Sequence, residues 1–231
     1  MQISRKDFLA LGLGGAIAAL SSTKADAQLV QRPQNWSPTE LHGIMNRTAK
    51  YRQVYDITQI GNGVFLNNIK NSLNGFQFSF GAQPSEINIV AALHGAANLL
   101  NFDDAMWKKY RLGEFIKMKD LKTGGFATRN LYYHSSADKA DHNPDSEKSI
   151  YQDKSIEGLQ ARGVHFFCCH TATEEQSRKL IARFGLKEKP ETIVKDLLNH
   201  RIPGTTVVPA MVATVAILQL DAHFSYITVA G

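Results

Sequence analysis

The sequence predicts an α/β fold: a single domain in which a mostly parallel sheet of about five strands carries helices on both faces. Segments typical of strands alternate with segments typical of helices about five times along the chain. Parallel strands need long crossover connections, so this alternation favours a parallel sheet in a three-layer arrangement. The run INIVAAL at 87–93 is continuously apolar and β-branched near its start, as expected for a strand buried on both faces. We find neither an internal repeat nor a second domain in the pattern.

The first half of the chain is expected to form three helices and two strands. The sequence SPTE at 37–40 resembles a capping box with proline at the first helical position, which predicts a short helix to about residue 49. Residues 53–57 alternate as in a strand. Within the helix predicted at 63–80, four apolar residues fall on one stripe at helical spacing: Ile69, Leu73, Phe76 and Phe80. The strand at 87–93 follows, and then a helix at 103–115.

Residues 117–154 differ from the rest of the domain. They are polar, lack clear periodicity, and contain Gly124-Gly125, Asn143-Pro144, His134 and His142. Such a segment is much longer than an ordinary connection, and loops of this length are usually lids, oligomer contacts or disordered segments. We interpret 117–154 as a long insertion loop.

Regular structure is predicted again after this loop. The expected elements are, in order, a helix at 155–162, a strand at 164–169, helices at 173–184 and 190–200, a strand at 205–208, a helix at 210–220 and a strand at 223–229. The helix at 210–220 is apolar nearly all round, so we expect it to be buried. The α/β domain is therefore expected over 51–231.

The N-terminus has the features of a cleavable signal peptide over 1–27. Arg5 and Lys6 precede the apolar run FLALGLGGAIAAL at 8–20, and small residues stand at Ala25 and Ala27. The segment SRKDFL at 4–9 resembles the twin-arginine export motif, with lysine in place of the second arginine. We therefore expect a periplasmic protein, exported by the twin-arginine or the general secretory route, whose residues 28–50 form an N-terminal extension with a short helix.

Composition argues against two classes of partner. The chain carries a formal net charge of +5, but the basic residues are scattered and no nucleic-acid motif is present. After the signal peptide, the longest apolar stretch is 210–220, which is too short for a membrane span. We expect neither a nucleic-acid partner nor a membrane span in the mature protein.

Candidate site residues follow two of the predicted strands. His94 comes directly after the strand at 87–93, and Cys168, Cys169 and His170 lie at the end of the strand at 164–169. Ligands of open α/β sheets bind outside the carboxyl ends of the strands. A helix N-terminus and an imidazole both lower a cysteine pKa, so a thiolate here would be a nucleophile, a persulfide carrier or a soft metal ligand.

The alternatives differ from residue to residue. Cys168 and Cys169 point to opposite faces of a strand, which favours core packing for Cys168 and function for Cys169. Neighbouring cysteines cannot form an ordinary structural disulfide. For His94 and for His170, a role as catalytic base or ligand and a purely structural role are both open. His165 is expected in the core, and His134 and His142 are expected to be solvated loop residues. Zinc and phosphate-loop signatures are absent from the sequence.

Two stretches resemble the DsrE-like family. They are LQARGVHFFCCHTA at 159–172 and IPGTTVVPA at 202–210, the latter followed by a helix and FSYITV at 224–229. The resemblance extends over about residues 50–231. It implies a flavodoxin-like three-layer fold, assembly as a homo-oligomer (trimer or hexamer), and sulfur relay through a persulfide on the strand-end cysteine. Cys169 best matches that sulfur-carrying position, and Cys168 is an added residue.

Three hypotheses for function follow. The first is a periplasmic sulfur-carrier or thiol-redox protein acting through Cys169, with Cys168, His94 or His170 assisting and a sulfur donor or redox partner. This role requires no cofactor. The second is a binding module without turnover that holds a metal, haem or small ligand at the same site, with Cys169, His170 and His94 as metal ligands. The third is a structural, oligomer-forming domain.

Overall fold

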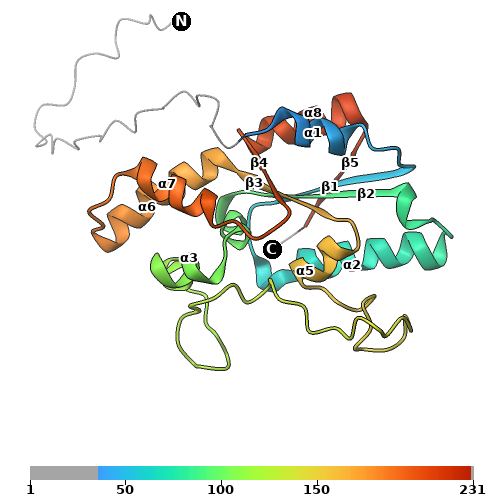
Figure 1. The fold of residues 1–231 in the computed structure, drawn as a ribbon, viewed down its shortest axis with the longest axis horizontal. Coiled ribbons are helices and arrows are strands. Elements are labelled where there is room, and N and C mark those ends of the chain that lie inside the picture. Colours follow the sequence, from blue (N-terminus) through green and yellow to red (C-terminus); the bar gives the residue numbers. More distant parts are fainter. Residues whose placement is uncertain (1–35, 230–231) are drawn as a thin grey trace, which may run out of the picture.

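A computed structural model describes residues 36–229 and contains one five-stranded sheet in which every pairing is parallel. The strands are β1 (Tyr51–Ile57), β2 (Ile87–Leu93), β3 (His165–Cys169), β4 (Thr205–Val208) and β5 (Ser225–Thr228), in the order β4-β3-β2-β1-β5. The predicted α/β class and the number of strands are confirmed (Figure 1). The predicted signal peptide lies outside the described residues.

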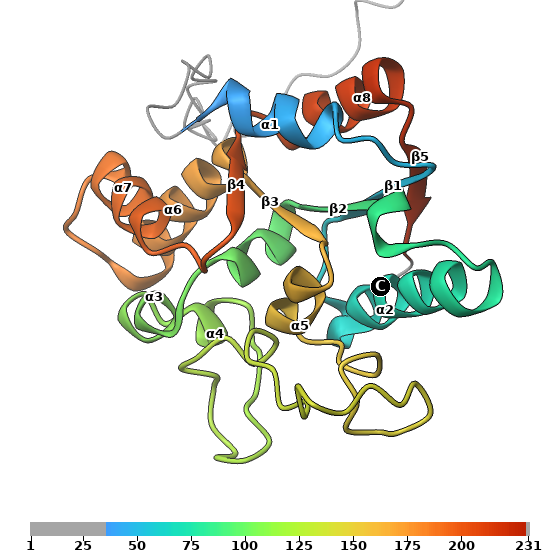
Figure 2. The same cartoon turned by 45° about the vertical axis from the view of Figure 1, so that its right-hand side comes forward.

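The helices form a layer on each side of this sheet. They are α1 (Pro38–Met45), α2 (Val64–Asn74), α3 (Asp104–Lys109), α4 (Leu112–Phe115), α5 (Ile156–Ala161), α6 (His170–Phe184), α7 (Pro190–Asn199) and α8 (Met211–Ala222). Short 3-10 segments, η1 (Gly61–Gly63) and η4 (Gly95–Asn101), follow β1 and β2. Helices α1 and α8 cover one face, and α2 and α5 lie across the sheet from them (Figures 1 and 2).

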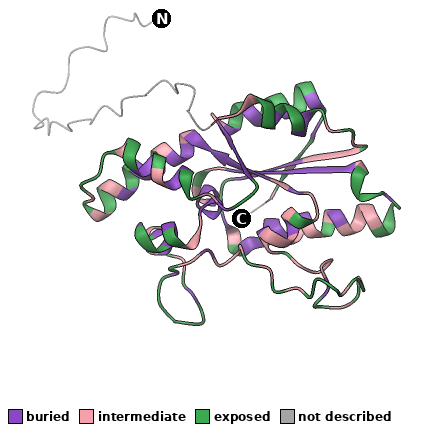
Figure 3. Cartoon of the chain, viewed as in Figure 1, coloured by how far each residue is buried: buried purple, intermediate pink, exposed green. Residues whose placement is uncertain are grey.

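Two hydrophobic cores result from these layers. The larger core joins the inner faces of α2, α5 and α7 to one side of the sheet, and the smaller core joins α1 and α8 to the other. Strand β3 contributes to both, since Phe166 and Cys168 point into the larger core while Phe167 and Cys169 point into the smaller one. Buried residues accordingly concentrate on the central strands (Figure 3).

The chain reverses direction across the sheet at β1. Strands β1 to β4 follow one another towards one edge, and α8 then returns across the sheet so that β5 pairs with β1 on its other side. The crevice beside β1, at the carboxyl ends of the strands, is therefore the topological switch point. Open α/β sheets bind ligands at such points.

Several predicted helices differ from the observed ones. Helix α1 begins at Pro38 with the Ser37 side chain as its cap, 3.4 Å from the Glu40 nitrogen, but ends at Met45 rather than near residue 49. The single helix predicted at 103–115 is broken between α3 and α4, where Arg111 has a φ of 52°. Helix α6 begins at His170, three residues earlier than predicted, because Cys169 itself caps it.

The structure also differs from the expected stripe of the helix at 63–80 and from the expected burial of the helix at 210–220. Phe80 is 72% exposed, because α2 continues as a single π-helical turn, η2 (Gly75–Ser79), that ends before it. Helix α8 is not buried all round, since Val212 is 73% and Leu220 75% exposed. The helix packs on the sheet with one side only, and within residues 36–229 nothing covers its other side. No helix in this part of the chain has the length and apolar character needed to cross a membrane.

Candidate functional site

Four reactive or polar side chains lie on one face of the sheet, three of them at or directly after the carboxyl-terminal ends of neighbouring strands. Cys169 ends β3, His94 directly follows β2, Asp56 is the penultimate residue of β1, and Tyr226 lies on β5. Strands β2 and β3 pair with Leu93 opposite Cys168, so His94 and Cys169 occupy the next step on neighbouring strands, which lie about 4.8 Å apart. All four residues face the side of the sheet covered by α1 and α8.

The sulfur of Cys169 lies between two helix N-termini. Its Sγ accepts a hydrogen bond from the Ala172 nitrogen in the first turn of α6 and from the Met211 nitrogen at the start of α8, each at 3.4 Å. The turn before α8 is attached to the start of α6, because the Pro209 carbonyl accepts from both the nitrogen and the hydroxyl of Thr171, at 3.2 and 2.9 Å. Both helices thus direct the positive ends of their dipoles at one sulfur atom.

Burial opposes the effect of these donors on the thiol. Cys169 is only 4% exposed, and this burial raises its pKa above the ordinary value, while the Ala172 and Met211 nitrogens act in the opposite direction. The sequence analysis predicts a lowered pKa from a helix N-terminus and a nearby imidazole. That expectation was wrong about the net direction, because desolvation of the thiolate outweighs the backbone donors.

Cys168 has a different environment. It is fully buried in the larger core, and burial raises its pKa to about 12. Its sulfur lies 3.8 Å from the Thr173 hydroxyl. This environment agrees with the packing role weighed for Cys168, and the two free sulfurs lie on opposite sides of the strand.

A buried polar network fixes the backbone of Cys169. The Asn98 Oδ1 accepts from the Cys169 nitrogen at 2.9 Å, and the Asn98 Nδ2 donates to Thr173 Oγ1 at 2.9 Å and to Gln176 Oε1 at 3.1 Å. The Thr173 hydroxyl in turn donates to the Cys169 carbonyl at 2.9 Å. Gln176 extends the network to the Gly95 carbonyl, at 2.5 Å, next to His94. Sequence reasoning missed these residues, since a lone asparagine in a short apolar segment carries no recognisable pattern.

His94 is oriented by a carboxylate. Its Nε2 lies 2.6 Å from Asp56 Oδ1, and the other oxygen of Asp56 accepts from the Tyr226 hydroxyl at 2.7 Å. The His94 and Asp56 side chains are 17% and 22% exposed, so the pair is accessible from solvent. The hydrogen bond to Asp56 raises the pKa of Tyr226. Asp56 and Tyr226 were also missed, although a lone acid near the end of an apolar strand was a usable signal.

His170 is buried at the start of α6, and His165 is half-buried at the start of β3. His170 Nδ1 lies 3.7 Å from Glu174 Oε1; burial lowers the pKa of His170, and the carboxylate opposes that shift. Burial, together with the nearby Arg47, also lowers the pKa of His165. Both imidazoles therefore favour the neutral form.

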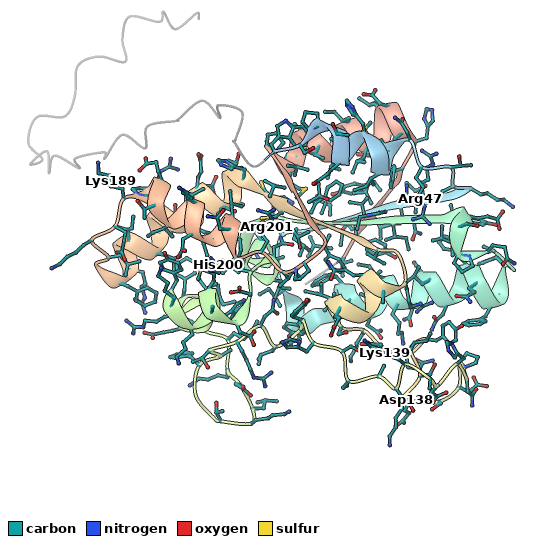
Figure 4. The ribbon with its side chains drawn as sticks, in the orientation of Figure 1. Arg47, Asp138, Lys139, Lys189, His200 and Arg201 are labelled. Carbon is teal, nitrogen blue, oxygen red and sulfur yellow. The ribbon has the colours of Figure 1, made fainter. Side chains whose placement is uncertain are left out.

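The long loop does not reach Cys169. It packs beneath α2 and α5, where Asn74 Nδ2 donates to the Tyr151 carbonyl at 2.9 Å. Figure 4 shows Asp138 and Lys139 of this loop across the sheet from α1 and α8. His134 lies 3.8 Å from Asp104 and is 63% exposed, and the ring of His142 lies near Tyr151. Neither histidine joins the cysteine site.

The predicted metal ligands do not form a cluster. Within residues 36–229, no group of three or more His, Cys, Asp or Glu side chains is placed to hold a metal ion. His94 is engaged with Asp56 and His170 faces Glu174, so the set of Cys169, His170 and His94 is not assembled. The structure therefore gives no geometric support for a metal site formed by these three residues.

Comparison with protein-family models, with curated proteins and with solved structures finds no match to this chain.

Proposed function

We propose that the protein carries sulfane sulfur on Cys169. The observation that supports this role is the pair of backbone donors, Ala172 and Met211, that approach the Cys169 sulfur from two helix N-termini at 3.4 Å. Backbone donors and helix dipoles of this kind stabilise negative charge on sulfur, whether it is a thiolate or the terminal sulfur of a persulfide. The resemblance to the DsrE-like family points to the same residue.

The chemistry is a transfer between sulfur atoms. The Cys169 thiolate attacks the outer sulfur of a donor such as thiosulfate, a bond forms between the two sulfurs, and sulfite leaves with the electron pair of the broken bond. The thiol proton leaves first, and His94, which directly follows the strand next to β3 and whose Nε2 lies 2.6 Å from Asp56 Oδ1, is the proposed acceptor. Because Cys169 is only 4% exposed, a sulfur donor can reach it only when the residues that cover it move. Transfer of sulfur to Cys169 is therefore expected to be slow.

Mass spectrometry tests this role directly. The purified chain is incubated with thiosulfate or polysulfide, and peptides containing the two cysteines are compared in the wild type, Cys169→Ser and Cys168→Ser. We expect added sulfur in the wild type and in Cys168→Ser, and none in Cys169→Ser. An unmodified Cys169 thiol after prolonged incubation would rule the carrier role out.

A small-ligand binding module without turnover is the second candidate. The hydrogen-bonded Asp56, His94 and Tyr226 favour it, because they present partly exposed polar groups at the switch point. A native mass spectrum of protein recovered from the periplasm would show a bound small molecule if this role holds. The same spectrum tests the proposed export past residue 27 and the proposed trimer or hexamer. For a purely structural role, both cysteines should resist alkylation until the protein unfolds.

A further inference from the structure

A cleft opens beyond the carboxyl ends of β1 and β2, and Cys169 is not among the residues that line it. It has a volume of about 1110 Å³ and lies between the turn after β1, at 59–62, and two parts of the long loop, 116–122 and 129–136. Small-molecule sites in proteins occupy about 300–1,000 Å³, so the cleft is large enough for an organic ligand. It adjoins the switch point of the sheet, where ligands of α/β proteins bind.

The cleft carries an excess of positive charge. Lys117, Lys119, Lys122 and Arg129 line it, and Asp120 is the only carboxylate among its lining residues. Asp120 is 6% exposed and already engaged: its Oδ1 accepts from the Lys122 nitrogen at 2.9 Å and its Oδ2 from Arg129 at 3.1 Å. None of the three lysine ammonium groups forms an ion pair with any residue in 36–229.

These lysines lie on a hairpin-like segment that is held in place. The Ala127 nitrogen donates to the Met118 carbonyl at 2.9 Å, and the Met118 nitrogen donates to the Gly113 carbonyl of α4 at 2.7 Å. The fit against α4 is close, since a Cβ on Gly113 would lie 2.1 Å from the Ala127 oxygen. A fixed backbone lowers the entropy lost when a ligand is bound.

The turn after β1 forms another part of the cleft wall. Gly61, Asn62 and Gly63 all have positive φ, and Gly63 caps the N-terminus of α2. Tyr132 of the long loop packs on this turn so closely that a Cβ on Gly63 would lie 2.5 Å from its ring. The long loop and the turn after β1 are therefore packed together as two parts of the wall of one cleft.

We propose that this cleft binds a small organic phosphate. The three lysines, none of which is in an ion pair, match a multiply charged anion. Apolar side chains in the lining, such as Ile60, Met118 and Leu131, match an organic body attached to it. Inorganic phosphate carries the negative charge but has no apolar group, so the cleft is expected to bind an organic phosphate ester with higher affinity than inorganic phosphate. This site is separate from Cys169 and does not depend on sulfur transfer.

Calorimetric titration of the full chain tests the site with AMP, glucose 6-phosphate, phenyl phosphate and inorganic phosphate. We expect at least one organic phosphate to bind more tightly than inorganic phosphate. The triple variant Lys117→Ala, Lys119→Ala, Lys122→Ala should weaken that binding about tenfold or more, because charge-assisted hydrogen bonds are lost. A matched triple variant of exposed lysines outside the cleft, Lys148→Ala, Lys187→Ala and Lys189→Ala, should bind as the wild type does (Lys189 is labelled in Figure 4).

Three outcomes would overturn the proposal: no binding of any organic phosphate, equal affinity for inorganic phosphate, or equal loss in both triple variants. The last would show only general attraction to a basic protein. Cys169→Ser should leave the binding unchanged whether or not Cys169 carries sulfur, so failure of the sulfur-carrier role and failure of this site are distinguishable.

Discussion

The two faces of the sheet differ in how they are covered and in what they carry. One face is packed by α2, α5 and α7 around a large apolar core, whereas the other is covered by α1 and α8 alone. Asp56, His94 and Cys169 all lie on the second face. Cys168, one residue away, is fully buried in the larger core, and its sulfur lies 3.8 Å from the Thr173 hydroxyl. The thinner layer thus covers a cysteine with two backbone donors and a partly exposed histidine–aspartate pair, whereas the thicker layer covers a cysteine packed among apolar side chains.

The largest expected effect tests whether the two cores differ in rigidity. Phe166 and Phe167 are adjacent, equally buried at 0% exposure, and point to opposite faces. Replacing either with alanine should lower the free energy of unfolding by about 3–5 kcal/mol, with Phe166→Ala near the upper end because the larger core collapses less readily around a cavity. Urea unfolding of both variants measures this. A larger loss of unfolding free energy in Phe167→Ala than in Phe166→Ala would contradict the expected difference between the two cores.

The next effect concerns the two thiols. Cys168→Ser places a hydroxyl in the apolar core and should lower the free energy of unfolding by about 1–3 kcal/mol. Cys169→Ser should cost less, because the Ala172 and Met211 nitrogens remain as donors to the new oxygen. Chemical denaturation of both variants under reducing conditions gives the difference. Equal losses would mean that the two backbone donors contribute little at Cys169.

The pH dependence of stability tests the histidines beside β3. Burial lowers the pKa of His165 and of His170, so the unfolded chain binds more protons than the folded one below about pH 6.5. The stability that these groups contribute is therefore fully present above that pH and is lost as the pH falls through their folded pKa values. Urea unfolding between about pH 7.5 and about pH 5.5 should show the loss.

Variants identify the source of that pH dependence. His165→Gln and His170→Gln should each reduce the decline in stability on acidification, whereas His42→Gln, at an exposed position on α1, should leave it unchanged. A decline that is the same in all three variants would assign the effect to other groups.

The smallest expected effect concerns the hydrogen bond from β5. Tyr226→Phe removes the donor to Asp56 but should lower the free energy of unfolding by only about 0.5 kcal/mol, since the ring is 44% exposed and water replaces the hydroxyl. Thermal unfolding measures the change. A loss as large as that in Cys168→Ser would mean that the pairing of β5 with β1 depends on this one contact.

Local patterns were sufficient for most of the fold. The strands at 87–93 and 205–208 have the predicted bounds. The first is an almost continuous apolar run and the second is made of β-branched residues, and both compositions favour a buried strand. The strand alternation that separates Cys168 from Cys169 was also predictable, since it follows from the pleat. The exposed side of helix α8 was not predictable, because its apolar composition does not reveal how many of its sides other elements cover.

The sequence by itself determined the α/β class, the approximate strand bounds and the presence of a cysteine and a histidine at strand ends. These features depend on local periodicity and on the geometry of the strand. Only the tertiary structure decided that β5 returns beside β1, which brings Tyr226 to Asp56 across 170 positions of the chain. It also decided that two helix starts converge on Cys169, that burial nevertheless raises the pKa of its thiol, and that the long loop joins the turn after β1 in a basic cleft. Contacts between distant segments and the degree of desolvation depend on the whole packing, and a local pattern does not encode them.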